Sequence, residues 1–260
     1  MIRIIHISDL HYQTNYNKLN CFYKEFMPQL LSPFVIIDEL LKEYDKNVDL
    51  LIVSGDLCEN GSEDDYRMVK KQLEEKFNCP IIYCYGNHDN KSNMKAAIYG
   101  DRNALDNSLW QNDKLQVLSI DSSNEKYPDG FILDDTIDYA IEKLQTGKNT
   151  IIVTHHHLLQ NQFTMQRASG SDKFLSQIKK YDNLKGIVTG HTHHFFHTMI
   201  DEIPYYTVGS CSFLISEYQK TLRFYQKPEI NYYEVDDTIK CQRIRKDSLD
   251  KYIGIVVQNG

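Results

Sequence analysis

Aspartate and histidine residues follow several short apolar runs in this 260-residue chain. The first pair is Asp9 and His11, directly after the apolar segment 2–8. Asp56, with a glycine before it, follows residues 50–54 in the same way. Because residues two apart on an extended chain point to the same side, the Asp9 carboxylate and the His11 imidazole can reach one cation. Taken alone, each group could also consist of ordinary turn residues.

Two further groups are more specific. Residues 86–89 read Gly-Asn-His-Asp after the apolar run 81–85, and four specified residues in a row occur by chance in about one of 600 chains of this length. Histidines follow two more apolar runs, at 155–157 and at 191 and 193. An asparagine-rich turn and a solvated histidine patch are the alternative interpretations. The candidate ligands here are Asn87, His155, His191 and His193.

The joint pattern carries more weight than any one group. Five predicted strands each deliver Asp, Asn or His at the carboxyl end, which is the edge of an α/β sheet where sites assemble. Carboxylate, amide and imidazole ligands without cysteine suit divalent Mn, Fe or Zn. Seven candidate ligands are too many for one ion but suit two ions that share a carboxylate. Two ions about 3.5–4 Å apart are a common device for hydrolysing phosphate esters.

The elements that must position these residues can be read from the periodicity. Short β-branched runs alternate with amphipathic helical patterns as far as residue 190, which indicates an α/β fold, and only strands follow residue 203. The expected strands are 2–8, 50–54, 81–85, 115–120, 150–154, 186–189, 205–208, 212–216, 230–235, 239–244 and 252–257. The expected helices begin near the capping residues Ser32, Ser62, Asp135 and Ser171. The pair Asp236-Asp237 predicts a hairpin turn.

In their order along the chain, these motifs resemble those of the calcineurin-like metallophosphoesterases. The matching blocks are Asp9-Leu10-His11, Gly55-Asp56, Gly86-Asn87-His88-Asp89, His155 and Gly190-His191-Thr192-His193. The resemblance implies a four-layer α-β-β-α sandwich with a metal centre at the strand ends. It implies one metal held by Asp9, His11 and His193, and another held by Asn87, His155 and His191. Asp56 would bridge the two metals, and His88 would lie by the substrate, oriented by Asp89.

The finer similarity is to the class III cyclic nucleotide phosphodiesterases. Asp121-Ser122 after a strand, and the segment 204–210 before a terminal hairpin, resemble that branch. The branch usually follows the histidine ligand with a second histidine and two prolines, whereas residues 156–159 here read His-His-Leu-Leu. The resemblance implies hydrolysis of a small phosphodiester, of the cyclic nucleotide or glycerophosphodiester type, by attack of a hydroxide that bridges two divalent ions.

Other activities on this fold remain as alternatives. A phosphomonoesterase would differ only in the groups that line the pocket, and a non-catalytic scaffold would be expected to have lost ligands, whereas all seven positions are filled. A nuclease is disfavoured because 29 basic residues against 36 acidic ones give a net charge of −7, and nucleic-acid binding usually requires a basic surface.

Composition also bears on location and organisation. The chain has no run of 18 apolar residues and no signal-peptide pattern at its start, and its six cysteines form no C-x-x-C pair. We therefore expect reduced thiols, a cytoplasmic protein and no membrane partner. Without a repeat or linker, we expect a single domain over residues 1–260. The strand-rich part 204–260 would complete the sandwich or contribute to a homodimer, and the aperiodic segment 12–31 would overhang the site or form a surface loop.

Overall fold

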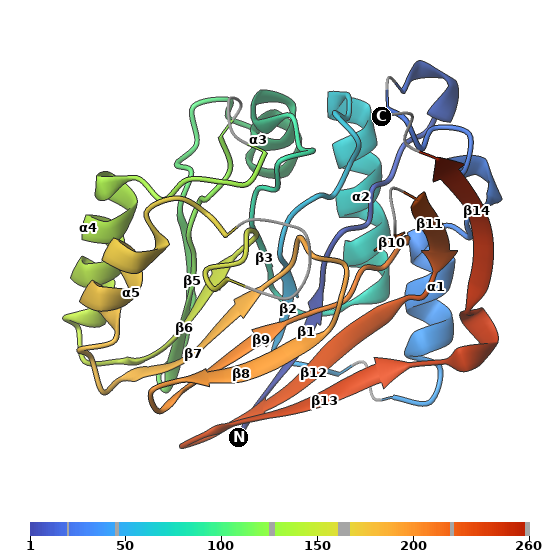
Figure 1. The fold of residues 1–260 in the computed structure, drawn as a ribbon. Coiled ribbons are helices and arrows are strands. Elements are labelled where there is room, and N and C mark those ends of the chain that lie inside the picture. Colours follow the sequence, from blue (N-terminus) through green and yellow to red (C-terminus); the bar gives the residue numbers. More distant parts are fainter. Residues whose placement is uncertain (20, 45–46, 125–127, 161–166, 219–220, 258–260) are drawn as a thin grey trace.

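The computed structural model describes residues 1–19, 21–44, 47–124, 128–160, 167–218 and 221–257. Two main β-sheets lie face to face, with helices on the outer face of each (Figure 1). The first sheet has the strand order β13-β12-β1-β2-β3, and the second has the order β4-β5-β6-β7-β9-β8. This is the four-layer α-β-β-α sandwich that the family resemblance implies.

The first sheet is built around two parallel strand pairs. Strand β1 (Ile2–Ile7) runs parallel to β2 (Leu50–Val53), which runs parallel to β3 (Ile81–Tyr83). On the other side of β1, β12 (Glu229–Val235) pairs antiparallel and continues through a hairpin into β13 (Ile239–Arg245). The predicted turn at Asp236-Asp237 is therefore confirmed.

The second sheet has a parallel centre and antiparallel edges. Strands β5 (Leu115–Ser119), β6 (Asn149–Thr154), β7 (Leu184–Thr189) and β9 (Ile203–Thr207) are parallel neighbours. The edge strands β4 (Ser108–Gln111) and β8 (Phe196–Ile200) pair antiparallel with β5 and β9. Since β1, β2, β3, β6 and β7 end at one side of the sandwich, the loops that follow them meet there.

Three buried clusters hold the layers together. Apolar residues of α1 (Pro33–Leu40), α2 (Glu63–Lys76) and α3 (Lys91–Tyr99) pack on the outer face of the first sheet. Helices α4 (Asp134–Leu144) and α5 (Ser171–Ile178) cover the second sheet in the same way. Between the sheets lie side chains from the inner faces of both, such as Ile4, Ile52, Val117, Val153 and Val188. Strands buried on both faces explain the continuous apolar runs in the sequence.

A smaller sheet lies outside this sandwich. Strands β10 (Leu214–Tyr218), β11 (Thr221–Gln226) and β14 (Lys251–Val257) form it, and residues of the segment 16–30, which contains the 3₁₀ turns η1 (Tyr16–Lys18) and η2 (Met27–Gln29), pack against it. A last turn, η3 (Asp247–Leu249), precedes β14. The residues after 203 thus contribute to all three sheets, and the small sheet was not predicted.

Two of the four predicted helix starts, Ser32 and Ser62, are right, and the other two are displaced by one or two residues. Ser62 caps α2, and its capping box with Asp65 satisfies two backbone N–H groups that helix formation leaves free. Helix α4 begins at Asp134 after Leu133, so the prediction of Asp135 as the cap is wrong. Helix α5 begins with Ser171 itself, because Gly170 supplies the cap in a left-handed conformation. Ser32 precedes α1 as expected, although its side chain makes no capping hydrogen bond.

Within the part of the chain that the structure describes, no helix combines the length and the apolar character that crossing a bilayer requires. All six cysteines are free thiols. Three of them, Cys58, Cys84 and Cys211, are buried among apolar side chains or beneath the candidate site, where a reduced cysteine behaves as a small hydrophobic residue.

Candidate metal centre

The loops after the central strands are bonded to one another. The Asp9 N–H donates to the Gly55 carbonyl (3.1 Å) and the His11 N–H donates to the Asp56 carbonyl (2.9 Å), which locks the β1 and β2 loops side by side. In the second sheet, the Gly190 N–H donates to the His155 carbonyl (3.0 Å). The His191 N–H donates to Asp9 Oδ2 (3.1 Å), and this bond joins the loops of the two sheets across 182 positions of sequence.

The backbone at these positions is strained rather than extended. Seven non-glycine residues in the described chain have positive φ angles, and five of them are candidate ligands: Asp9 (54°), His11 (47°), Asp56 (50°), His191 (71°) and His193 (56°). Such conformations cost about 1–3 kcal/mol each and cluster at functional sites. Asp9 and His11 do converge, as predicted. The reason given for it, an extended chain in which residues two apart share a side, is wrong. The side chains of Asp9 and His11 converge because both residues are left-handed.

One group of ligand atoms comes from Asp9, His11 and His193. The His193 Nε2 atom lies 3.3 Å from Asp9 Oδ1 and 3.1 Å from His11 Nε2. All three side chains are buried, and Asp9 Oδ1 accepts no hydrogen bond in the described chain. A buried carboxylate oxygen without a donor is costly, so this orphan atom, facing two imidazole nitrogens, fits a bound cation.

A second group comes from Asn87, His155 and His191. The His155 Nε2 atom lies 3.2 Å from Asn87 Oδ1, and the rings of His155 and His191 have centroids 5.0 Å apart. His191 Nε2 is buried and has no hydrogen-bond partner among the described residues. This set therefore also contains an orphaned ligand atom, and its amide oxygen and imidazole nitrogens suit Mn, Fe or Zn.

Asp56 lies between the two groups. Its Oδ2 atom is 3.2 Å from His155 Nε2 of the second group and 3.8 Å from His11 Nε2 of the first. Its Oδ1 atom accepts a hydrogen bond from the His88 N–H (2.8 Å), which fixes the carboxylate plane. The structure thus brings together all seven residues that the sequence predicts, with Asp56 at the centre.

The outward-facing nitrogens of the histidines are held by carbonyl and carboxylate oxygens. His155 Nδ1 donates to the Ser54 carbonyl (2.7 Å), and His193 Nδ1 donates to the Phe213 carbonyl (2.6 Å). His11 Nδ1 donates to the carboxylate of Glu59. Because these oxygens only accept hydrogen bonds, each Nδ1 carries a proton, and each Nε2 faces the centre, where it can bind a cation through its lone pair. Metal-ligating histidines have this arrangement.

The electrostatics of the cluster favour a cation. Burial lowers the pKa of the His155 imidazole, but the carboxylates of Asp56 and Asp9 outweigh burial and raise this pKa to about 9. His88 behaves alike: burial lowers its pKa, whereas Asp56 and Glu59 raise it to about 10. A buried carboxylate cluster that attracts protons so strongly attracts a metal cation for the same reason.

The glycines of the motifs make room for the carboxylates. A Cβ atom at Gly86 would lie 2.0 Å from Asp56 Oδ1, and one at Gly190 would lie 2.0 Å from Ser8 Oγ and 3.0 Å from Asp9 Oδ2. Any larger residue at either position would displace the ligand-bearing loops. The glycines therefore serve close packing of backbone against buried carboxylates.

Asp89, which was expected to orient His88, bonds to other groups. The Asp89 carboxylate accepts hydrogen bonds from the Cys58 N–H (3.1 Å), the Tyr66 hydroxyl (3.2 Å) and the Gly86 N–H (3.0 Å). Burial, followed by the nearby Asp56 carboxylate, raises the pKa of Asp89 to about 7. The structure corrects the expected role: Asp89 braces the loop that carries His88 and makes no hydrogen bond to the His88 ring.

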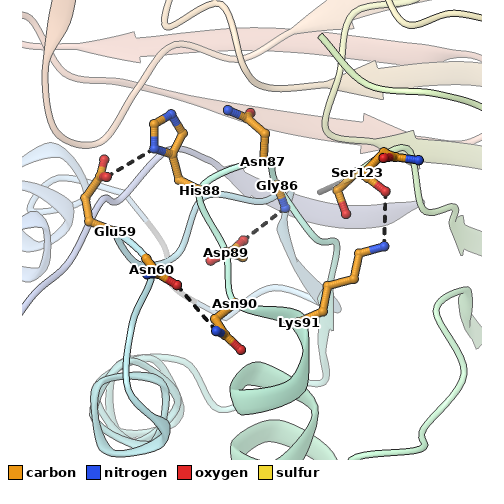
Figure 2. A pocket seen from close by; sticks show the side chains of 10 residues that line it. Glu59, Asn60, Gly86, Asn87, His88, Asp89, Asn90, Lys91 and Ser123 are labelled. Atoms are coloured by element: carbon orange, nitrogen blue, oxygen red, sulfur yellow. Dashed lines mark hydrogen bonds and ion pairs between the residues drawn. The ribbon is translucent and has the colours of Figure 1, made fainter. Parts of the chain in front are cut away.

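Glu59 is the carboxylate that contacts the His88 ring. Its Oε2 atom lies 3.1 Å from His88 Nδ1, and its Oε1 atom accepts from His11 Nδ1 and the Tyr23 hydroxyl. Figure 2 shows the Glu59 and His88 side chains pointing toward one another. The sequence analysis missed Glu59. Its position three residues after Asp56, on the same ligand-bearing loop, was the available signal.

His156 is excluded as a ligand although it adjoins His155 and His191. Its Nδ1 lies 2.8 Å from Ser122 Oγ and its Nε2 lies 2.9 Å from the Pro128 carbonyl oxygen. Both ring nitrogens are therefore used in the protein. His155 therefore remains the ligand proposed from this run, with its Nε2 facing Asn87 Oδ1.

A pocket of about 350 Å³ opens beside the cluster (Figure 2). Its described lining consists of glycine and polar side chains: Glu59, Asn60, Gly86, Asn87, His88, Asp89, Asn90, Lys91, Ser123 and Asn124. Lys91 is held by the Asp121 carboxylate and by the Ser123 carbonyl (3.1 Å). The pocket therefore adjoins both His88 and the second group of candidate ligands.

Comparison with known proteins identifies the family. The family model described as calcineurin-like phosphoesterase matches residues 2–195, which include every candidate ligand. The chain belongs to the calcineurin-like phosphoesterase family. The resemblance predicted from the motif order is therefore confirmed, and so is the fold class.

Relatives named as phosphodiesterases agree with this family, and a solved structure shares the fold. The chain is 28% identical over 155 residues to a probable cyclic nucleotide phosphodiesterase of Synechococcus, a match that covers 58% of this chain and 60% of the relative, less than two thirds of its length. It is 25% identical over 206 residues to the Haemophilus influenzae 3',5'-cyclic adenosine monophosphate phosphodiesterase CpdA, covering 74% and 70%. A dimetal phosphatase from Danio rerio has the same fold, with a TM-score of 0.61, 11% identity and coverage of 97% and 98%.

Proposed function

We propose that this phosphoesterase-family chain is a binuclear metal-dependent phosphodiesterase that hydrolyses a small phosphodiester. The observation that carries the proposal is the position of Asp56, whose carboxylate lies between two buried ligand groups that each contain an orphaned polar atom. A shared carboxylate is what two adjacent cations require. The names of the relatives support diester over monoester substrates.

The proposed roles follow from the geometry. When bound, two divalent ions supply positive charge to the phosphate oxygens and make a hydroxide nucleophile available near neutral pH. In its doubly protonated form, the His88 ring donates from Nδ1 to Glu59 and gives its Nε2 proton to the leaving alcohol oxygen. Glu59 fixes the ring orientation of His88 and of His11 together. Asp89 keeps the loop that carries Asn87 and His88 in place.

We propose Mn, Fe or Zn as the ions and the cytoplasm as the location, in keeping with the nitrogen and oxygen ligands and the six unpaired thiols. We also propose that residues 1–260 act as one metallophosphoesterase domain. The net charge of −7 favours a small diester over nucleic acid as the substrate.

Activity with and without metal tests the proposal. We expect the purified protein to hydrolyse bis-p-nitrophenyl phosphate after Mn²⁺ loading, to lose this activity after chelation and to regain it when Mn²⁺ is added back. The assay is release of p-nitrophenolate, with p-nitrophenyl phosphate as the monoester control. A Mn²⁺-loaded protein that hydrolyses neither compound would refute catalysis, and a preference for the monoester would refute the diesterase assignment. Cyclic nucleotides, glycerophosphodiesters and single-stranded DNA then define the substrate.

A further inference from the structure

One side chain from the segment 16–30 reaches the candidate site. Tyr23 is 4% exposed, and its hydroxyl donates a hydrogen bond to Glu59 Oε1 (2.6 Å). The same hydroxyl oxygen lies 3.4 Å from His88 Nδ1. Burial, and then the Glu59 carboxylate, raise the pKa of Tyr23 above its usual value, so the hydroxyl keeps its proton and remains a donor.

The Tyr23 ring is fixed by the small sheet. It packs against Phe213 (centroids 5.1 Å apart) and Phe224 (6.2 Å), both in or next to the small sheet and both beyond the part of the chain that the family model matches. Phe213 itself contacts the ring of His11 (4.8 Å), and its carbonyl accepts from His193 Nδ1. These aromatic residues therefore join the small sheet to the metal centre.

The carboxylate of Glu59 has two oxygens and three donors. His11 Nδ1 and the Tyr23 hydroxyl donate to Oε1, which leaves Oε2 to His88. Without the Tyr23 hydroxyl, Oε1 keeps one partner, and rotation of the carboxylate costs less. A carboxylate that turns toward His11 loosens the His88 ring, whose Nε2 must meet the leaving oxygen.

We propose that Tyr23 is a positioning residue, which holds the His88 imidazole in place through Glu59. This inference rests on the proposed function, because it assigns a role within the same site. It also gives the segment 16–30 and the small sheet a part in the reaction.

The test compares two buried tyrosines. Tyr23→Phe removes the hydroxyl and keeps the ring, and Tyr83→Phe is the matched control, since the buried Tyr83 hydroxyl has no hydrogen-bond partner among the described residues. We expect Tyr23→Phe to lower kcat about 10-fold on a diester with an alkyl leaving group. This is the size of effect expected when one hydrogen bond to a charged group is lost. We expect KM, metal content and kcat on bis-p-nitrophenyl phosphate to change less than about 2-fold, because these do not depend on proton donation.

A double-mutant cycle and a direct readout separate positioning from packing. In a Glu59→Gln background, Tyr23→Phe should have almost no further effect on kcat, whereas additive losses would overturn the proposal. In protein labelled with ¹⁵N-histidine, the Nδ1–H proton of His88 should exchange with water faster in Tyr23→Phe than in wild type or Tyr83→Phe. Unchanged exchange would overturn the proposal. Because this signal needs no turnover, an inactive wild type would refute the proposed function and still leave the positioning of His88 testable.

Discussion

Replacing Asp56 by asparagine should abolish turnover and release metal. The substitution keeps the shape of the side chain but removes the negative charge that lies between the two ligand groups. Two cations in adjacent positions would then repel each other without compensation. We expect the loss of at least one metal ion per chain and a fall in kcat of about 10³-fold or more, with the fold retained. Elemental analysis and diester hydrolysis on the same preparation measure both effects.

Asp65→Asn is the matched control for this variant. Asp65 is also buried, but its carboxylate serves the Ser62 capping box and the Thr14 backbone. Weakening these hydrogen bonds should cost about 1 kcal/mol of stability and leave metal content and kcat near wild-type values. An Asp56→Asn enzyme within tenfold of the wild-type kcat would remove Asp56 from the bridging role.

His88→Ala should lower kcat/KM more for a diester whose leaving group needs a proton than for one whose leaving group departs without it. p-Nitrophenolate departs readily without a proton, so bis-p-nitrophenyl phosphate should lose comparatively little activity. An alkoxide needs protonation, so kcat/KM for an alkyl diester should fall by about 10²–10⁴-fold. Metal content should stay unchanged, since His88 belongs to neither group of candidate ligands. The measurement is kcat/KM on both substrate types, with metal analysis alongside.

His197→Ala controls for the removal of an imidazole elsewhere. His197 is an exposed residue of β8 that stacks on Tyr206, away from the ligand loops, and its loss should leave both substrates unaffected. Equal losses on both substrates in His88→Ala would show that His88 positions substrate or stabilises charge instead of donating a proton. Loss of metal would show that His88 is a ligand.

The candidate ligands were predictable because chain order and strand ends suffice to place them. A buried strand followed by Asp, Asn or His delivers that side chain to one edge of the sheet, and this argument needs no tertiary coordinates. How the side chains converge was not predictable. Asp9 and His11 have positive φ angles, which aspartate and histidine rarely adopt on their own. The hydrogen bonds between neighbouring loops impose them.

The partners of the ligands were harder to predict, since they depend on contacts across the fold. Glu59 contacts His11, which lies 48 positions away in sequence. Tyr23 contacts Glu59 from a segment without helical or strand periodicity. Asp89 makes no hydrogen bond to the His88 ring because its carboxylate accepts from the Cys58 N–H, the Tyr66 hydroxyl and the Gly86 N–H. Burial of Asp89 against Cys58 and Tyr66 decides its role.

Elements with weak patterns were missed for a similar reason. Helix α3 is short and amphipathic only over a few residues. Edge strand β8 alternates half-buried with exposed positions, and edge strand β4 has no fully buried residue. Strand β11 is formed by its pairing with β10 on one side and with β14 on the other. Strand propensity in such segments follows from their neighbours.

Metal stoichiometry is the most direct test of the account. After loading with Mn²⁺ and desalting, elemental analysis of the wild-type protein should find about two divalent ions per chain, as expected of a centre in which two cations share one carboxylate. The Asp65→Asn control should give the same value, and diester hydrolysis should rise with occupancy of the second ion. One ion or fewer per chain in an active, folded wild-type protein would contradict the binuclear centre.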